Sequence, residues 1–359
     1  MWGVIVDLVA SRADGDDVDL WSSQAALKVD GVVNRSSVSK DTIYINDPAC
    51  GAGVLLSDGV RLLANARWCH TGTIPGSPIF SFDRKEAEAL LDKDPRRCAV
   101  LQPLWRAREV MAGTSLPETF LLDLTDSRAP EAEWPILYGL LDARKRSDRR
   151  MRRASGPWWH LRRPRRELAA RLAEPISQEG RPPNTVLARP ALADPHLYTV
   201  LPAGARFDQS LVVWPERPWL IPGKQVLELD SSWALFGCLQ SDVHRIWVGR
   251  FTMNFTRLTR YTVKLFQSFP LPEDLDALQD VVTRAKDFDA TRQLAKKEGV
   301  TPAALARGGQ SKAAMSALAQ LNVAVRAAYG WHDEPDEEET MLRLAHIRTT
   351  RFDYTKSTT

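Results

Sequence analysis

The chain has few of the residues that build metal sites and disulfide frameworks. Its 359 residues include only four cysteines and six histidines. The cysteines, Cys50, Cys69, Cys98 and Cys238, show no CxxC spacing, and the histidines form no HxxxH or HExxH pair. Zinc sites and disulfide-rich secreted domains depend on such spacings. We therefore expect no metal site and no disulfide.

Long apolar runs are also missing. A membrane-spanning helix needs about 18 consecutive apolar residues, and no such run occurs. The N-terminal stretch MWGVIVDLVASRADGDD turns acidic after a short apolar segment and lacks the positively charged start of a signal peptide. These absences predict a cytoplasmic protein with no membrane partner. The length suffices for two or three domains, and the 44% hydrophobic content suffices for a core.

Charge is unevenly distributed, although the net charge is only +3. Between Arg144 and Arg171, twelve Lys or Arg residues face two acidic ones, Asp148 and Glu167, a local charge of +10 in 28 residues. Such a run repels itself unless an anion is nearby, which favours DNA phosphates as the partner over a solvated helix face. The expected phosphate contacts are Arg144, Lys145, Arg146, Arg149, Arg150, Arg152, Arg153, Arg162, Arg163, Arg165 and Arg166.

A second basic stretch runs from Arg245 to Lys264 and contains five basic residues and no acidic one. Within it, arginine alternates with threonine and asparagine. Arginine suits guanine and asparagine suits adenine in the major groove, so these side chains are candidates for reading base edges. The candidates are Arg250, Thr252, Asn254, Arg257 and Arg260.

Other prominent residues have a packing interpretation. Adjacent tryptophans ahead of a helix, such as Trp158 and Trp159, more often anchor it to a core than stack on a base. His244 lies between apolar residues of an amphipathic pattern, which indicates a hydrogen-bonded structural histidine. Tyr261 and Phe269 are expected to pack as well.

The local patterns predict an α+β fold. Strand-like runs occur at 42–47 and as TVLA, LYTVL, SLVVW and QVLEL between 185 and 230. Asp83 is the expected N-cap of a short helix, with Glu86 three positions on. The basic stretch in 137–180 has a helical pattern interrupted by Gly156 and Pro157. A further helix is expected from Ser231 or Ser232 through Trp247, followed after Pro272 by one ending near Gly299 and one carrying Met315, Leu318, Leu321 and Val325.

Three segments carry a family resemblance. They are WALFGCLQSDVHRIW at 233–247, RYTVKLFQSFPLPE at 260–273 and AYGWHD at 328–333. Together with the Trp158–Trp159 pair and the Pro-Arg segment that follows it, they resemble the target-recognition and C-terminal region of MmeI-like adenine-N6 DNA methyltransferases. These are large fused restriction-modification and phage-defence enzymes. The ordered match covers roughly residues 60–332.

The resemblance implies a domain layout and a function. It implies a DNA target-recognition domain at 59–272 and a helical C-terminal module at 273–332, with an N-terminal β-containing extension at 1–58 outside the match. Residues 333–359 depart from the family, and the run DEPDEEE predicts an acidic, flexible tail. The implied function is sequence-specific binding of duplex DNA as the specificity part of a methyltransferase. S-adenosylmethionine would then bind a separate catalytic chain and not this one.

The motif DPACGAG at 47–53 is interpreted first as an ordinary strand and turn, and it also keeps an alternative open. It resembles the glycine-rich loop by which class I methyltransferases hold S-adenosylmethionine, with Asp47, Gly51 and Gly53 as the cofactor-binding residues. Extruded adenine also needs an Asn-Pro-Pro-aromatic motif, and the nearest string, RPPN at 181–184, lacks the leading amide and the aromatic ring. The alternatives are a self-contained methyltransferase and a degenerate fragment acting as a structural subunit. No catalytic residue is assigned.

Overall fold

The structure is a computed structural model that describes most of the chain. The described residues are 42–47, 52–57, 65, 68–173, 185–193, 197–216, 219–221, 224–226, 229–251, 254–255, 258–300, 305 and 311–356. Helices and strands alternate along them, which confirms the expected α+β class.

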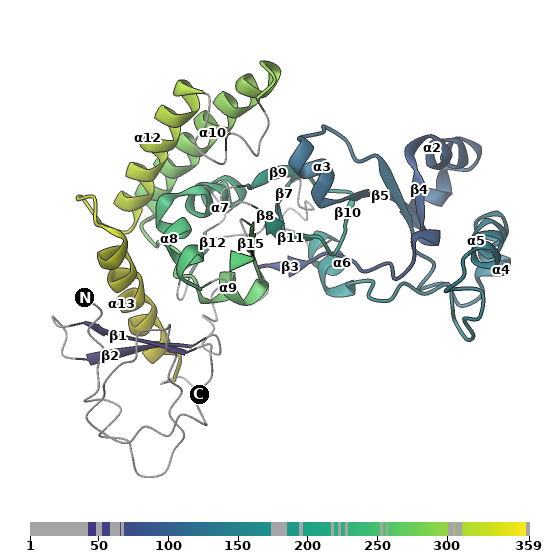
Figure 1. Ribbon diagram of the computed structural model, residues 1–359, viewed down its shortest axis with the longest axis horizontal. Coiled ribbons are helices and arrows are strands. Elements are labelled where there is room, and N and C mark those ends of the chain that lie inside the picture. The colour runs from purple at the N-terminus through teal and green to yellow at the C-terminus, as the bar shows by residue number, and fades with distance from the viewer. Residues whose placement is uncertain are drawn as a thin grey trace, which may run out of the picture.

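Helices lie at both ends of the molecule and also among the strands between them (Figure 1). In chain order they are α2 (Arg84–Lys93), α3 (Ala107–Ala112), α4 (Pro130–Glu133), α5 (Pro135–Ser147), α6 (Arg166–Ala173), α7 (Ser231–Gln240), α8 (Asp242–Phe251), α9 (Val263–Ser268), α10 (Leu275–Lys297), α12 (Lys312–Ala328) and α13 (Glu337–Lys356), with short 3-10 helices at Pro78–Phe80 and Pro95–Ala99.

The strands form two four-stranded sheets and three smaller ones. The central sheet has the order β3 (His70–Thr71), β11 (Leu211–Pro215), β7 (Thr185–Pro190), β9 (Thr199–Pro202), all antiparallel. The outer sheet has the order β10 (Arg206–Phe207), β5 (Leu101–Trp105), β6 (Thr119–Leu122), β4 (Ser81–Asp83). The smaller sheets join β1 (Thr42–Asp47) to β2 (Ala52–Ser57), β12 (Trp219–Ile221) to β13 (Lys224–Val226), and β14 (Asn254–Phe255) to β15 (Leu258–Arg260) and β8 (Leu192–Ala193).

The central sheet is buried on both faces. Successive side chains of a strand point to opposite faces, so Leu187 and Trp214 join the core shared with the helices, while Val186 and Val213 join a smaller core on the other side. Burial on both faces explains why SLVVW and TVLA read as continuous apolar runs without alternation. The strand-like segments predicted between 185 and 230 are confirmed at β7, β9, β11 and β13.

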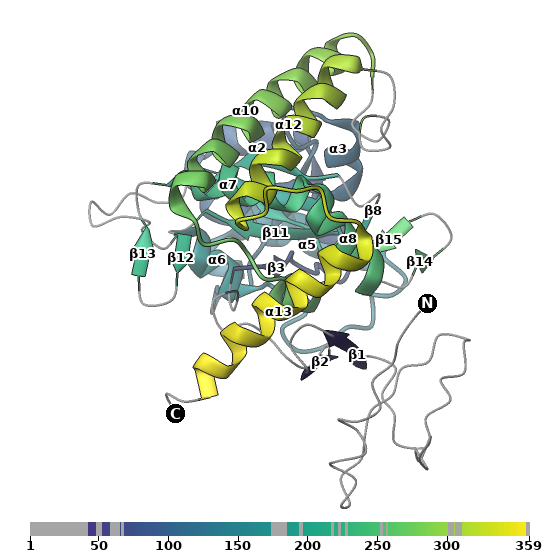
Figure 2. The same ribbon diagram turned by 90° about the vertical axis from the view of Figure 1, so that its left-hand side faces the viewer.

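One core joins the helices to the central sheet. In both ribbon views α10 and α12 run side by side, with α7 beneath them (Figures 1 and 2). Gly237 permits this approach, because a Cβ there would lie 2.6 Å from Val281 Cγ1 of α10. The buried cluster includes Phe266 before residue 272 and Leu278 after it. The structure therefore has no break in packing at the boundary expected at 272.

One helix expectation needs correction. The helix predicted from Ser231 through Trp247 is in fact two, α7 and α8, which meet at Ser241. The Ser241 hydroxyl donates to the Cys238 carbonyl at 2.7 Å and accepts from His244 N at 3.4 Å, so it ends one helix and begins the next. Two other predictions are confirmed. The Asp83 carboxylate accepts from Glu86 N at 2.8 Å, and α10 ends just before Gly299, whose φ is +87°.

The expected flexible tail is wrong for most of its length. Residues Glu337–Lys356 form α13, and Leu344 and Ala345 are completely buried against the helical core. The acidic run before this helix also has partners. Asp336 Oδ1 accepts from Glu339 N at 2.8 Å, and Asp333 binds Arg343 at 2.6 Å, which lowers the pKa of the Asp333 carboxyl. The apolar residue Leu344 could have indicated a packed helix, but the prediction of a flexible tail rested on the charges around it.

Among the described helices, none is long and apolar enough to cross a membrane.

Candidate nucleic-acid interface

The helical pattern expected at 137–180, with a break at Gly156 and Pro157, is present only in part, because the break is much longer. Helix α5 ends at Ser147 and α6 begins at Arg166, and the residues between them form a series of turns that we call the arginine loop (148–165). Asp148 and Gly156 shape the backbone of this loop locally. The Asp148 carboxylate accepts from Arg150 N at 2.7 Å and Met151 N at 3.0 Å, and these bonds lower its pKa. Gly156 has a φ of +67°, which glycine adopts without strain.

A short segment, Ile74–Ser77, holds both ends of the arginine loop. Ser77 Oγ donates to Asp148 Oδ2 at 3.1 Å at one end. At the other end Arg162 N donates to the Pro75 carbonyl at 3.2 Å, and Ile74 pairs with Arg163 in an antiparallel bridge. Arginines that lie ten or more positions apart in sequence therefore flank one short segment.

Gly76 is required for this arrangement. Its φ is +91°, and a Cβ at this position would lie 2.9 Å from Arg162 Cβ. Any other residue at position 76 would strain the backbone, and its side chain would push Arg162 of the arginine loop away. In the sequence, Pro75 and Gly76 indicate only a turn, because no local pattern shows what the turn packs against.

Six of the eleven predicted phosphate-contacting residues are exposed and unpaired. They make no ion pair with any residue that the structure describes. They are Arg149, Arg150, Arg152, Arg153, Arg162 and Arg163. All six belong to the arginine loop, on either side of Ile74–Ser77.

The other five predicted residues have protein partners. Arg144 donates to the Ser81 carbonyl at 2.7 Å, pairs with Glu86 at 2.5 Å and covers the Phe82 ring at 3.7 Å. Its role in the structure is to tie α5 to β4 and α2. The remaining partners are Trp158 for Lys145, whose Nζ lies 4.4 Å from the ring centroid, Asp142 for Arg146 at 2.8 Å, Glu167 for Arg165 at 3.5 Å, and Asp126 for Arg166.

The tryptophan pair anchors the arginine loop, in line with the packing interpretation. Trp158 and Trp159 are partly buried against the core of the outer sheet. Their rings lie 6.1 Å apart at 84°, and Tyr138 of α5 lies 5.4 Å from Trp158. Edge-to-face contacts of this kind add to the stabilisation from burial. The loop is thus held by packing at its centre and by hydrogen bonds at both ends.

The predicted base-reading segment divides among three elements. Arg250 ends α8, where it is half-buried and near Glu338 of α13, and burial lowers the pKa of its guanidinium. Asn254 lies in β14, and Arg260 lies in β15, which pairs with β8 at Leu192. Arg260 is exposed. The side chain of Asn254 and the whole of Thr252 and Arg257 lie outside the described residues.

A buried polar network fixes the base of this hairpin. His244 is fully buried, and its Nδ1 donates to the Leu239 carbonyl at 2.9 Å. Its Nε2 is then free to accept from the Tyr261 hydroxyl at 3.1 Å. Arg189, also fully buried, donates to Tyr198 Oη at 3.2 Å and lies 4.5 Å from the Tyr261 ring centroid. Burial raises the pKa of both tyrosines. These contacts confirm that His244 and Tyr261 are structural. Arg189 and Tyr198 were not predicted as part of this network, because no local motif in the sequence marks them.

The described residues of DPACGAG lie in two antiparallel strands. Asp47 ends β1 and pairs with Ala52, and Gly53 of β2 pairs with Asn46. Residues 48–51, which include Gly51, lie outside the described residues. A class I cofactor loop leads from a strand into a helix, whereas here residues 52–57 form an antiparallel strand. The hairpin geometry therefore weakens the cofactor-loop alternative.

The described residues contain no cluster of three or more side chains suited to a metal ion. Cys69, Cys98 and Cys238 are free thiols, and burial raises the pKa of Cys69 and Cys238.

Comparison with known proteins gives a likeness of fold. No protein-family model matches the chain, and no curated protein matches it in sequence. Among solved structures, the Type IIL restriction-modification enzyme MmeI, solved in complex with DNA, is similar with a TM-score of 0.58 and 15% sequence identity. The match covers 88% of this chain and 42% of the MmeI chain. At this identity the likeness shows that the chain shares a fold with part of a restriction-modification enzyme.

Proposed function

We propose that this chain binds duplex DNA as the target-recognition part of a restriction-modification or phage-defence system of type IIG character. The observation that carries the proposal is the group of six exposed, unpaired arginines held on either side of Ile74–Ser77. Arginine without a carboxylate partner is well suited to phosphate, which it can bind through two parallel hydrogen bonds. The fold shared with part of a DNA-bound restriction-modification enzyme supports the same function.

The two basic regions have different tasks in this proposal. The arginine loop contacts phosphates, which position the protein but carry little sequence information. The β14–β15 hairpin reads bases, with Arg260 as its exposed described residue and Thr252, Asn254 and Arg257 as the further candidates. Arg250 contributes less, because it is half-buried near α13.

Binding to duplex DNA as a function of salt tests the proposal. If all six arginines neutralise phosphates, the slope of log affinity against log salt is about −5. Affinity then falls about a thousand-fold between 50 and 200 mM salt. Absence of binding at low salt, or binding that salt does not change, would reject the proposal.

Substitution of Arg260 separates base reading from phosphate contact. Arg260→Ala is expected to cost on the order of 1–3 kcal/mol on the preferred site and to leave nonspecific binding nearly unchanged. The preferred site is first obtained by selecting bound sequences from a random pool. An equal loss on all sequences would mean that the hairpin is another phosphate-contacting surface.

The proposal assigns methylation to a separate adenine-N6 methyltransferase chain that carries S-adenosylmethionine. The Asn-Pro-Pro-aromatic motif that would hold the target adenine is absent from the sequence. The isolated chain is therefore expected to transfer no labelled methyl group to DNA. Transfer that disappears in Gly51→Asp would instead favour a self-contained methyltransferase using DPACGAG.

A further inference from the structure

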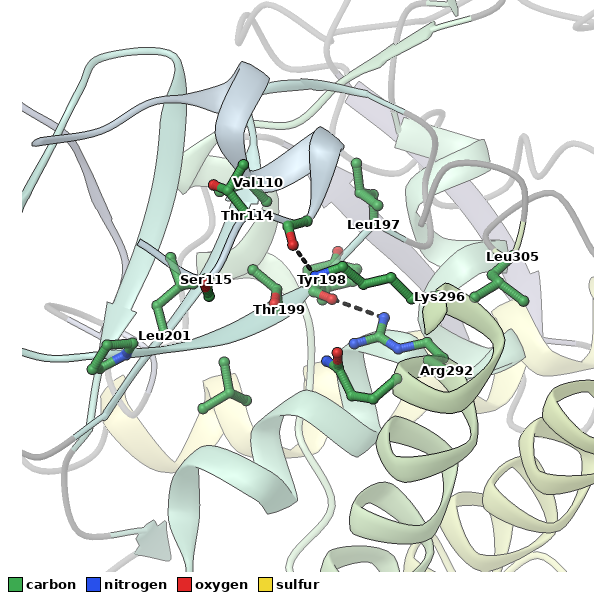
Figure 3. Close-up of a pocket in the computed structure, with 14 residues that line it drawn as sticks. Val110, Thr114, Ser115, Leu197, Tyr198, Thr199, Leu201, Arg292, Lys296 and Leu305 are labelled. Carbon is green, nitrogen blue, oxygen red and sulfur yellow. Dashed lines mark hydrogen bonds between the residues drawn. The ribbon is translucent and has the colours of Figure 1, made fainter. Parts of the chain in front are cut away.

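A cavity of about 210 Å³ lies between α3, β9 of the central sheet and α10, and no residue of the arginine loop lines it. One wall is the end of α3 and the turn after it, including Thr114 and Ser115. The floor is formed by Leu197–Pro202, which includes β9, and the opposite wall carries Arg292 and Lys296 of α10 (Figure 3). Three segments far apart in sequence therefore build it.

The described lining of this cavity is positively charged. It contains Arg292 and Lys296 and no aspartate or glutamate. Arg292 is clamped, because it donates to the Tyr198 carbonyl at 2.9 Å and pairs with Asp289 at 2.5 Å. Lys296 differs, since it donates to the Gly113 carbonyl and makes no ion pair with any described residue. A half-buried ammonium without a counter-ion favours an anion beside it.

Uncommitted hydrogen-bonding groups lie near Lys296. The hydroxyls of Ser115 and Thr199 bond to no described residue, and both side chains line the cavity. Figure 3 shows Thr199 between the α3 turn and the two cations of α10. Lysine has three donors, of which the Gly113 carbonyl uses one. Several donors thus remain available for the oxygens of a ligand.

Apolar side chains also line the cavity and limit the size of the ligand. Val110, Leu201 and Leu305 contribute to it. A dry cavity of about 150 Å³ is known to hold a benzene ring, so 210 Å³ accommodates a ring-sized body with one oxyanion group. We propose that this cavity binds a small oxyanion ligand, a phosphate or carboxylate on a ring-sized apolar body, with Lys296 as its counter-ion.

Such a ligand would bridge separate parts of the fold. The turn follows α3, which packs on β7 of the central sheet, whereas Lys296 lies on α10, and the Lys296–Gly113 contact already joins them. A bound oxyanion would add contacts to both sides. Ligand binding should therefore raise the thermal stability of the protein, because only the folded chain offers the site.

Calorimetric titration of the full chain tests the proposal with three probes that share one phenyl ring. Phenyl phosphate and benzoate are the phosphate and carboxylate arms, and benzyl alcohol is the uncharged control. We expect saturable binding of at least one anion, with benzyl alcohol bound at least about tenfold more weakly, since a charge-assisted hydrogen bond is the main difference. The tighter anion identifies the ligand class. Binding of neither anion at millimolar concentration, or equal binding of the alcohol, overturns the proposal.

Variants locate the site. Lys296→Gln keeps one donor for the Gly113 carbonyl but removes the charge, and should weaken anion binding about tenfold or more. Lys297→Gln removes the same charge from the neighbouring, exposed position and should have no effect. Thr199→Val serves as a second variant with conserved shape if Lys296→Gln folds poorly. Unchanged anion binding in both Lys296→Gln and Thr199→Val would refute the assignment. DNA binding by these variants should equal that of the wild type, which separates this site from the arginine loop.

Discussion

The division of the basic residues into unpaired and paired arginines leads to a direct test by substitution. Arg149→Ala with Arg153→Ala removes two unpaired guanidiniums from the arginine loop. Arg146→Ala with Arg166→Ala removes two that already pair with Asp142 and Asp126. Both double variants lower the net charge equally and act in or beside the same segment. They therefore separate phosphate contact from the general electrostatic field.

The expected magnitudes follow from counterion release. Each lost phosphate contact makes the salt slope less steep by about 0.9, so Arg149→Ala with Arg153→Ala should change it from about −5 to about −3.2. Between 50 and 200 mM salt the affinity of this variant should fall roughly 80-fold, against about a thousand-fold for the wild type. Arg146→Ala with Arg166→Ala should change the salt slope by less than half as much. In the wild type these two arginines must leave their carboxylates before they can contact phosphate, at a cost of about 0–1 kcal/mol each.

Fluorescence anisotropy with a labelled duplex, at four or more salt concentrations, measures both slopes. Thermal unfolding of each variant confirms that the fold is intact. If the two double variants lose the same slope, the ion pairs in the structure do not decide which arginines contact DNA. If Arg149→Ala with Arg153→Ala keeps the wild-type slope, the arginine loop is not the phosphate-binding surface.

Three further predictions concern the structure that supports this surface. Gly76→Ala should lower the free energy of unfolding by about 1–3 kcal/mol, because φ at this position is positive and Arg162 leaves no room; Gly249→Ala, with open space around its Cβ, serves as the control in urea unfolding. Leu344→Ala should cost about 2–5 kcal/mol by the same measurement, whereas a flexible tail would show no change. Burial raises the pKa of the Cys238 thiol, so near pH 9 this thiol ionises only in the unfolded chain. The free energy of unfolding should therefore fall as the pH rises above about 9, and it should fall less steeply in Cys238→Ala.

Local signals in the sequence predicted local structure well. The N-cap at Asp83, the end of α10 before Gly299 and the strands β7, β9 and β11 all follow from residues close together in the chain. Capping, helix termination and strand propensity act within a few residues, so they need no knowledge of the fold. The packing roles of His244 and the tryptophan pair were also predicted from their apolar neighbours.

Charge patterns were less informative about structure. The basic run predicted a helix, yet residues 148–165 form turns held by Ile74–Ser77, some 70 or more positions earlier. The acidic run predicted a flexible tail, yet α13 buries Leu344 against the core. Charge density gives the sign of the surface potential but not the backbone conformation, because the packing of a few apolar residues outweighs solvated charges.

The sequence by itself determined the α+β class, most element positions and the concentration of positive charge in two stretches. Only the tertiary structure decided which arginines are available, since Arg144 and Arg153 look alike in sequence but Arg144 binds Glu86 and two carbonyls. It also decided that Arg162 and Arg149 flank one segment, and that Lys296 meets the α3 turn across a cavity. Ion pairing and cavity formation depend on distances between residues remote in the chain, which no local pattern encodes.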